Sequence, residues 1–165
     1  MQIPIIATLT EESLELPVSE NKIKKERIAA RAVIFNLENK IVLFRPDSKI
    51  GYRIPGGGIE VGETIEDALH REVMEEVGAT IKINSNPTAQ LIELKNEKKT
   101  EQINFIFIAQ LVEIIELNKN VKWLSLDEAI EELYFQVPKT YKNVFRRMRD
   151  IKTLEYIKNI GDDNE

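Results

Sequence analysis

The chain has 165 residues, 42% of them hydrophobic and 31% charged, and contains no cysteine. This composition is typical of one globular domain with its own core, and it excludes disulfides and thiolate metal sites. The formal net charge of −5 argues against a surface dedicated to duplex nucleic acid, which needs a basic face. No apolar run approaches the roughly 20 residues that span a bilayer, and no secretory signal is recognisable. We therefore expect a cytoplasmic protein without a membrane partner.

The first third of the chain predicts strands followed by a long loop. Residues 1–26 form a polar lead-in segment with one short strand at 3–8. The runs 27–36 and 40–45 are rich in β-branched and apolar residues and are separated by the turn residues 37–39, so they predict a hairpin. Residues 46–63 are rich in Gly and Pro and predict a loop.

A helix with both ends marked follows this loop. Thr64 is a candidate N-cap, with Asp67 three residues later as a variant of the capping box, and Gly78 supplies the stop. Apolar residues recur every four positions and predict a face that packs on a sheet. They are Ile65, Leu69, Val73 and Val77.

The remainder predicts more strands and two helices. Strands are expected at 80–84, 88–95 and 102–112, with a turn at 96–100, and the short run 121–126 leads into a helix over 125–133. Ser125 and Glu128 form a second capping box. A long amphipathic helix begins at Tyr141; its basic cluster 146–149 is typical of a solvated face, and the acidic tail 161–165 is expected to fray. We expect one α/β (α+β) domain over 27–160, with a mixed sheet between helices.

The stretch REVMEEVG at 71–78 crowds three glutamates into two helical turns. Glu72, Glu75 and Glu76 fall within an arc of roughly 100° on one side of the helix. Carboxylates about 4 Å apart repel by a few kcal/mol, so helix stability does not explain the arrangement. One interpretation is a solvated acidic face on which Arg71 partly neutralises Glu75. The other is a site for a hard divalent cation, which takes oxygen ligands and removes the repulsion.

The residues just before the helix favour a cation site. Residues 55–63 read PGGGIEVGE, and three consecutive glycines let backbone groups approach a ligand closely. Glu63 lies at the helix start, within reach of a site built along that helix. The pattern lacks the lysine of a phosphate loop and the alternating oxygens of an EF-hand.

These residues resemble the signature of the Nudix family, in which a glycine is followed after five residues by a glutamate. After seven more residues comes Arg-Glu-aliphatic-any-Glu-Glu-any-Gly-aliphatic. Here the fixed positions are Gly57, Glu63, Arg71, Glu72, Val73, Glu75, Glu76 and Gly78, and only Ala79 departs, since a larger aliphatic residue is usual there. The departure concerns packing and not chemistry. The likeness extends to roughly residues 27–135.

The resemblance implies an α/β/α sandwich that hydrolyses a nucleoside diphosphate linked to another moiety, using Mg²⁺ or Mn²⁺. It assigns Glu72, Glu75 and Glu76 as metal ligands, with the Gly56 carbonyl completing the coordination. Glu63 supports the site or a second ion, and Arg71 orients the glutamates. The general base is either Glu72 or a glutamate of the loop after the long strand, where Glu116 is the candidate and Glu113 competes with it.

Several other side chains were weighed for contact with a substrate. Arg45 and Arg53 lie near the expected site and would reach phosphates, or are solvated or ion-paired arginines. Tyr52 faces a nucleobase or packs. Trp123 is expected to anchor the core or an edge rather than to stack on a base, and the single histidine, His70, is expected at the surface.

Three functions compete at this point. The leading one is a Mg²⁺-dependent pyrophosphohydrolase acting on modified or non-standard (d)NTPs, with nucleotide sugars and ADP-ribose next. A binding module for nucleotides or metabolites that has lost catalysis is the alternative, although it would have no need for repelling carboxylates. An isoprenoid diphosphate isomerase normally uses a cysteine, which this chain lacks. We expect residues 1–26 and the last helix to lie outside the core, where they would be available as a homodimer interface.

Overall fold

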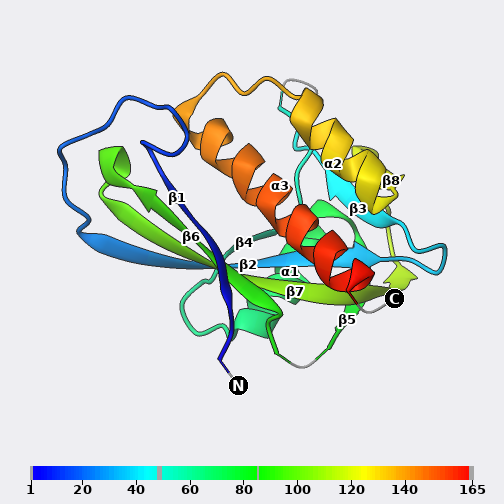
Figure 1. Ribbon diagram of the computed structural model, residues 1–165. Coiled ribbons are helices and arrows are strands. Elements are labelled where there is room, and N and C mark those ends of the chain that lie inside the picture. The colour runs from blue at the N-terminus through cyan, green and yellow to red at the C-terminus, as the bar shows by residue number, and fades with distance from the viewer. Residues whose placement is uncertain (1, 48–49, 85, 164–165) are drawn as a thin grey trace.

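A computed structural model describes residues 2–47, 50–84 and 86–163. Figure 1 shows the order of its elements along the chain. The strands are β1 (Ile5–Thr10), β2 (Lys25–Phe35), β3 (Ile41–Phe44), β4 (Gly56–Gly58), β5 (Ala79–Ile83), β6 (Ala89–Lys95), β7 (Thr100–Ile114) and β8 (Val121–Leu124). The α-helices are α1 (Ile65–Glu76), α2 (Leu126–Phe135) and α3 (Tyr141–Asp162), and one 3-10 turn, η1, spans Asn96–Lys98.

The strands form one mixed sheet in the order β1-β6-β7-β2-β3-β8, while β4 pairs with β2 and β5 with β7. The pairs β1–β6 and β2–β7 are parallel, and the other pairs are antiparallel. Helix α1 covers one face, whereas α2 and α3 cover the other (Figure 1). The expected α/β/α architecture with a mixed sheet is therefore confirmed.

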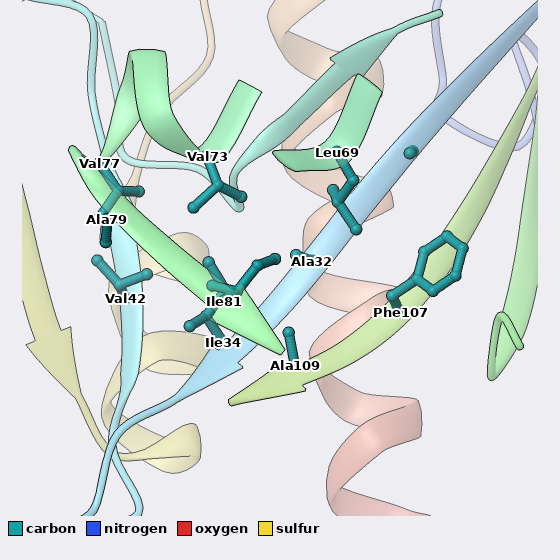
Figure 2. Packing of buried hydrophobic residues seen from close by; sticks show 11 residues of the cluster. Ala32, Ile34, Val42, Leu69, Val73, Val77, Ala79, Ile81, Phe107 and Ala109 are labelled. Carbon is teal, nitrogen blue, oxygen red and sulfur yellow. The ribbon is translucent and has the colours of Figure 1, made fainter. Parts of the chain in front are cut away.

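Alternate side chains of β2 belong to two separate hydrophobic cores, one on each face of the sheet. Ala32 and Ile34 belong to the cluster that packs on Leu69 and Val73 of α1 (Figure 2), whereas Val33 belongs to the cluster under α2 and α3. Successive side chains of a strand point to opposite faces, so one buried strand supplies both cores. None of the helices in the described part of the chain is long and apolar enough to cross a membrane.

The local signals at the helix ends are confirmed. Thr64 with Asp67 and Ser125 with Glu128 each form a complete capping box, in which side chain and backbone hydrogen-bond reciprocally. Gly78 follows the last turn of α1 with φ +80°, the left-handed conformation that glycine adopts without strain. The hairpin is also present, because β2 and β3 pair antiparallel with Phe35 opposite Ile41.

Three parts of the chain are more ordered than expected. The glycines 56–58, predicted as loop, form strand β4 because their extended backbone pairs with β2 from Ala29 to Arg31. The segment 1–26 contributes β1, which pairs in parallel with β6 and buries Leu9. The expected frayed tail is helical through Asp162, while 164–165 lie outside the described residues. Both terminal segments therefore pack on the sheet instead of lying outside the core.

The expectation that residues 146–149 form a solvated face is wrong. Arg149 is only 3% exposed and lies beside Asp150, which is 1% exposed. Arg149 Nε donates to Asp150 Oδ1 at 2.8 Å, and the amide of Ile54 donates to Asp150 Oδ2 at 3.1 Å. Glu93 on β6 supplies a second buried carboxylate, 3.9 Å from the Arg149 guanidinium. The pair therefore ties α3 to the chain two residues before the glycine strand.

We expect Asp150→Asn to destabilise the protein by about 3 kcal/mol, because it weakens the compensation of a buried arginine charge. Asp127→Asn is the matched control, since Asp127 pairs with Lys158 at the surface and is 73% exposed. That change should cost less than about 1 kcal/mol. Urea unfolding of both variants measures the difference, and equal losses would show that the buried pair has no special role.

We expect Gly78→Ala to be destabilising by about 2 kcal/mol or more, because a left-handed alanine is strained. In addition, the new Cβ would lie 1.7 Å from the carbonyl oxygen of Glu116, so backbone would have to move. Gly161→Ala in α3 is the control, because its Cβ would meet nothing within 4 Å. Thermal or urea unfolding should show Gly161→Ala at or above wild-type stability, and a loss as large as that of Gly78→Ala would contradict this account.

Candidate functional site

The predicted site lies where α1 meets the glycine strand β4. β4 runs antiparallel along the middle of β2, with Gly56 opposite Arg31 and Gly58 opposite Ala29. A Cβ at Gly57 would lie 2.3 Å from Glu72 Oε1, so only glycine leaves room for this carboxylate against the strand. The glycines thus bring the backbone close to a glutamate of α1.

Glu76 approaches the same strand one residue earlier. The amide of Gly56 donates to Glu76 Oε1 at 2.8 Å, and the positive φ of Gly56, +146°, is one that few other residues adopt. Burial, together with a smaller contribution from the charge of Glu72, raises the pKa of Glu76 to about 7. The hydrogen bond from Gly56 and the charges of Arg31 and Arg53 oppose this rise. The positive groups around Glu76 therefore do not compensate for the burial of its charge.

Arg71 forms hydrogen bonds or ion pairs with the other acidic side chains of the site. Its guanidinium donates to both oxygens of Glu63, at 2.5 and 3.1 Å, and to Glu72 Oε1 at 3.0 Å. It also donates to the carbonyl of Gly58 at 3.2 Å and lies 3.5 Å from Glu75. The hydrogen bond from Arg71 holds the pKa of Glu63 below its usual value. Arg71 therefore fixes α1, the loop before it and β4 relative to one another.

The carboxylates do not form a closed cage. Within residues 2–47, 50–84 and 86–163, no three His, Asp or Glu side chains are grouped so that they could hold a metal ion. Glu75 is 59% exposed, while Glu72 and Glu63 are engaged by Arg71 and Glu76 by Gly56. Carboxylates repel one another, so without a cation each glutamate turns toward its own hydrogen-bond donor.

The donor set nevertheless suits a hard divalent cation. All candidate ligands are oxygens, which Mg²⁺ prefers. Glu72 and Glu76 both lie against β4, and the raised pKa of Glu76 records the charge of Glu72 nearby. A cation between them would relieve both this repulsion and the burial of the Glu76 charge. The residues present therefore fit such an ion after a change of side-chain rotamers.

Glu116 lies at the far end of α1. Its amide donates to the carbonyl of Gly78 at 3.0 Å, and the residue is exposed. Its competitor Glu113 is exposed within β7, opposite Thr80. No contact in the described part of the chain joins either carboxylate to Glu72, Glu75 or Glu76, so the structure leaves both apart from the cluster.

Of the three residues expected to contact a substrate, two line a cavity and the third, Arg53, lies near the glutamates. Arg45 and Tyr52 line a cavity of about 740 Å³ between the loop after β3, the α2–α3 connection and the start of α3. Arg45 and Lys122 both lie over the Tyr52 ring, at 4.9 and 4.6 Å from its centre, so a nucleobase would have to displace a cation to stack there. The cavity is lined at its far side by Arg146 and Arg147.

Arg53 lies between the glutamates and α3. It is bridged to Phe44 by two backbone hydrogen bonds, and its Nε is buried without a hydrogen-bond partner among the described residues. Burial lowers the pKa of Arg53, while Glu76 and Glu72 oppose the shift. An unpartnered guanidinium nitrogen near two carboxylates is available to an oxyanion.

Sequence reasoning missed the buried polar residues behind the site. Gln102 and Asn104 of β7 and Glu93 of β6 are at most 1% exposed and hydrogen-bond to one another. Arg31 Nε donates to Asn104 Oδ1 at 3.3 Å. Polar residues alternating with apolar ones in a strand normally indicate a solvent face, so only knowledge of α3 reveals their burial. His70 is exposed and Trp123 packs at the edge of the α1 core, both as expected.

Solved structures share this fold. A NUDIX hydrolase from Nitrosomonas europaea superposes with a TM-score of 0.57 at 25% identity, covering 76% of this chain and 88% of that one. The Ap4A hydrolase of C. elegans superposes with a TM-score of 0.57 at 22% identity, covering 81% of this chain and 99% of the other. The second likeness shows the fold alone.

Curated relatives match over shorter stretches. An RNA pyrophosphohydrolase of Sodalis glossinidius is 42% identical over 50 residues, which are 30% of this chain and 29% of that protein. An ADP-ribose pyrophosphatase of Methanocaldococcus jannaschii is 40% identical over 55 residues, 32% of each chain. The chain thus matches about a third of the length of these relatives. The model of the NUDIX domain, in contrast, matches residues 25–148, so the chain belongs to the NUDIX domain family.

Proposed function

We propose that the protein is a pyrophosphohydrolase that requires Mg²⁺ or Mn²⁺ and cleaves a nucleoside diphosphate linked to another moiety. The observation that carries the proposal is the closure of Glu72 and Glu76 on the glycine strand, with Arg71 linking the same helix to Gly58. The family match and the names of the relatives, all of them phosphoric anhydride hydrolases, support it. Modified or non-standard (d)NTPs are the first candidates, followed by nucleotide sugars and ADP-ribose.

In this proposal Glu72, Glu75 and Glu76 hold the cation together with the carbonyl of Gly56. Glu63, which is held by Arg71, supports the ligands or a second ion, and Arg71 orients the helix for them. The bound cation supplies charge neutralisation of the diphosphate and lowers the pKa of a water molecule. The chain itself contributes positioning and electrostatic stabilisation, which dominate phosphoryl transfer.

Glu72 is our first candidate for the general base, because it already lies against β4. Glu116 would have to swing along α1 from its place beside Gly78, and Glu113 would have to leave a strand. Arg45, Arg53 and Tyr52 remain proposed substrate contacts; the unpartnered Nε atoms of both arginines support phosphate binding.

We place the enzyme in the cytoplasm and keep a homodimer as a prediction. The absence of cysteine supports this compartment. Light scattering tests the oligomeric state. The terminal segments, which pack on the sheet, have less free surface for an interface than expected.

A binding module that has lost catalysis is the second candidate, and one observation favours it. The glutamates are not gathered into a ligand set in the described part of the chain. Tight binding of a nucleotide that is unchanged in Glu76→Gln, and without any cleavage, would establish the module.

To test hydrolysis, the protein is incubated with Mg²⁺ and a panel of (d)NTPs, dinucleoside polyphosphates, nucleotide sugars and ADP-ribose. We expect turnover of at least one compound, and a loss of about 10²-fold or more in kcat/KM in Glu76→Gln, because one ligand of the cation is removed. Since Gln keeps the shape and removes the repulsion from Glu72, the stability of this variant should be at least that of wild type.

Glu66→Gln is the matched control on the same helix, because Glu66 is exposed in the first turn of α1, away from β4. It should retain wild-type activity. A folded protein that turns over nothing in the panel would refute the proposed hydrolysis, and equal activity of Glu76→Gln would refute the assigned ligand.

A further inference from the structure

A second cavity, of about 430 Å³, lies between the sheet and the first turn of α3. We call it the α3 pocket. Its walls come from the start of β2, the end of β6, the beginning of β7 and the first two residues of α3. Five of its lining residues are cationic, and no lining residue is acidic. These cations are Lys25, Arg27, Lys95, Lys98 and Lys142.

Four of these five cations form no ion pair in the part of the chain that the structure describes. Among the described residues, only Lys95 of the five forms an ion pair, with Glu93 at 3.8 Å. Repulsion by Arg146, followed by burial and by repulsion from Arg53 and Arg27, lowers the pKa of Lys142. Burial lowers the pKa of Lys95 to about 8. The pocket therefore holds positive charge that an anion would stabilise.

The acidic groups nearest to the α3 pocket are already engaged. Glu11 accepts hydrogen bonds from the hydroxyl of Tyr141 at 2.6 Å and from the amides of Ser19 and Glu97. Glu93 is buried with Arg149 and Asn104. The first turn of α3 also lines the pocket, and the positive end of the helix dipole adds to the field. An anion entering the pocket therefore meets five cations, of which Lys95 alone among the described residues is ion-paired with a carboxylate.

The α3 pocket and the candidate site adjoin the same glycine strand, β4. Arg27 packs on the glycine strand, since a Cβ at Gly58 would lie 2.8 Å from Arg27 Nη2. Gly58 is two residues from Gly56, which contacts Glu76, a separation of roughly 7 Å along an extended strand. Arg53 connects the two regions electrostatically, because it acts on Glu76 and also on Lys142. A ligand cleaved beside Glu72 and Glu76 could extend into the pocket past Arg53 and Arg27.

We propose that the α3 pocket binds the phosphate groups that a substrate carries beyond the bond that is cleaved, so that the preferred substrates contain three or more linked phosphates. This inference rests on the proposed function and narrows it. A phosphate chain neutralises the unpaired cations with charge-assisted hydrogen bonds. A neutral sugar in the same place would leave Lys25, Arg27, Lys98 and Lys142 without partners. Nucleotide sugars and ADP-ribose are therefore poorer substrates than nucleoside triphosphates or dinucleoside polyphosphates.

The binding experiment uses inorganic triphosphate as the probe, measured by calorimetry on the full chain. We expect triphosphate to bind more tightly than pyrophosphate, and each of Lys98→Gln and Lys142→Gln to weaken triphosphate binding about 10-fold. Lys152→Gln is the matched control: it removes the same charge from an exposed position ten residues further along α3, outside the pocket. All three side chains are exposed, and unfolding curves verify that the variants remain folded.

The kinetic experiment compares kcat/KM for a nucleoside triphosphate with that for ADP-ribose. In Lys98→Gln and Lys142→Gln we expect about a 10-fold loss for the triphosphate and a much smaller loss for ADP-ribose. Triphosphate binding that is unchanged in both variants would overturn the proposal, as would an equal loss for the two substrates. If no compound is hydrolysed but triphosphate binding depends on both lysines, the pocket stands as an anion site and the hydrolase proposal fails.

Discussion

The contact between the glutamates of α1 and the backbone of β4 is the constraint on which the candidate site depends. A side chain at position 57 would occupy the place of the Glu72 carboxylate, and the amide of Gly56 is the donor that holds Glu76. Pairing of β4 with β2 fixes the glycines, and the packing of Leu69 and Val73 on Ala32 and Ile34 fixes the helix (Figure 2). The helix and the strand therefore bring the carboxylates and the backbone together, and the rotamers of the glutamates determine whether they point toward a common cation.

Charge is distributed unevenly between the two sides of the glycine strand. On the α1 side carboxylates predominate and one arginine, Arg71, engages most of them. On the α3 side arginines and lysines predominate, and several have no carboxylate partner in the described part of the chain. A protein with a net charge of −5 can thus attract a polyanion locally. The cation and the basic residues would neutralise different parts of the same ligand.

The sequence was informative wherever a local signal has one physical meaning. The capping boxes at Thr64 and Ser125 and the stop at Gly78 were predicted correctly, because each depends on residues within a few positions. The pairing of β4 was not predictable, since a run of glycines is typical of loops and only the partner strand makes it extended. The burial of Arg149 was also missed, because its partners Asp150 and Glu93 lie on different elements and a basic helical cluster normally faces solvent. Glu116 would reach the glutamates of α1 only if its loop moved, and the spacing of residues in the sequence does not predict such a movement.

The outermost strand at one side of the sheet, β1, lies outside the segment that the family model matches. β1 spans Ile5–Thr10, whereas the match begins at residue 25. β1 covers the hydrogen-bonding edge of β6 (Figure 1). Glu11, just after β1, accepts a hydrogen bond from the hydroxyl of Tyr141. Trimming the protein to the family boundaries would leave the amides and carbonyls of β6 open to pairing with other chains, which invites aggregation. The same cut would remove Glu11, and Tyr141 in the wall of the α3 pocket would lose the acceptor of its hydroxyl.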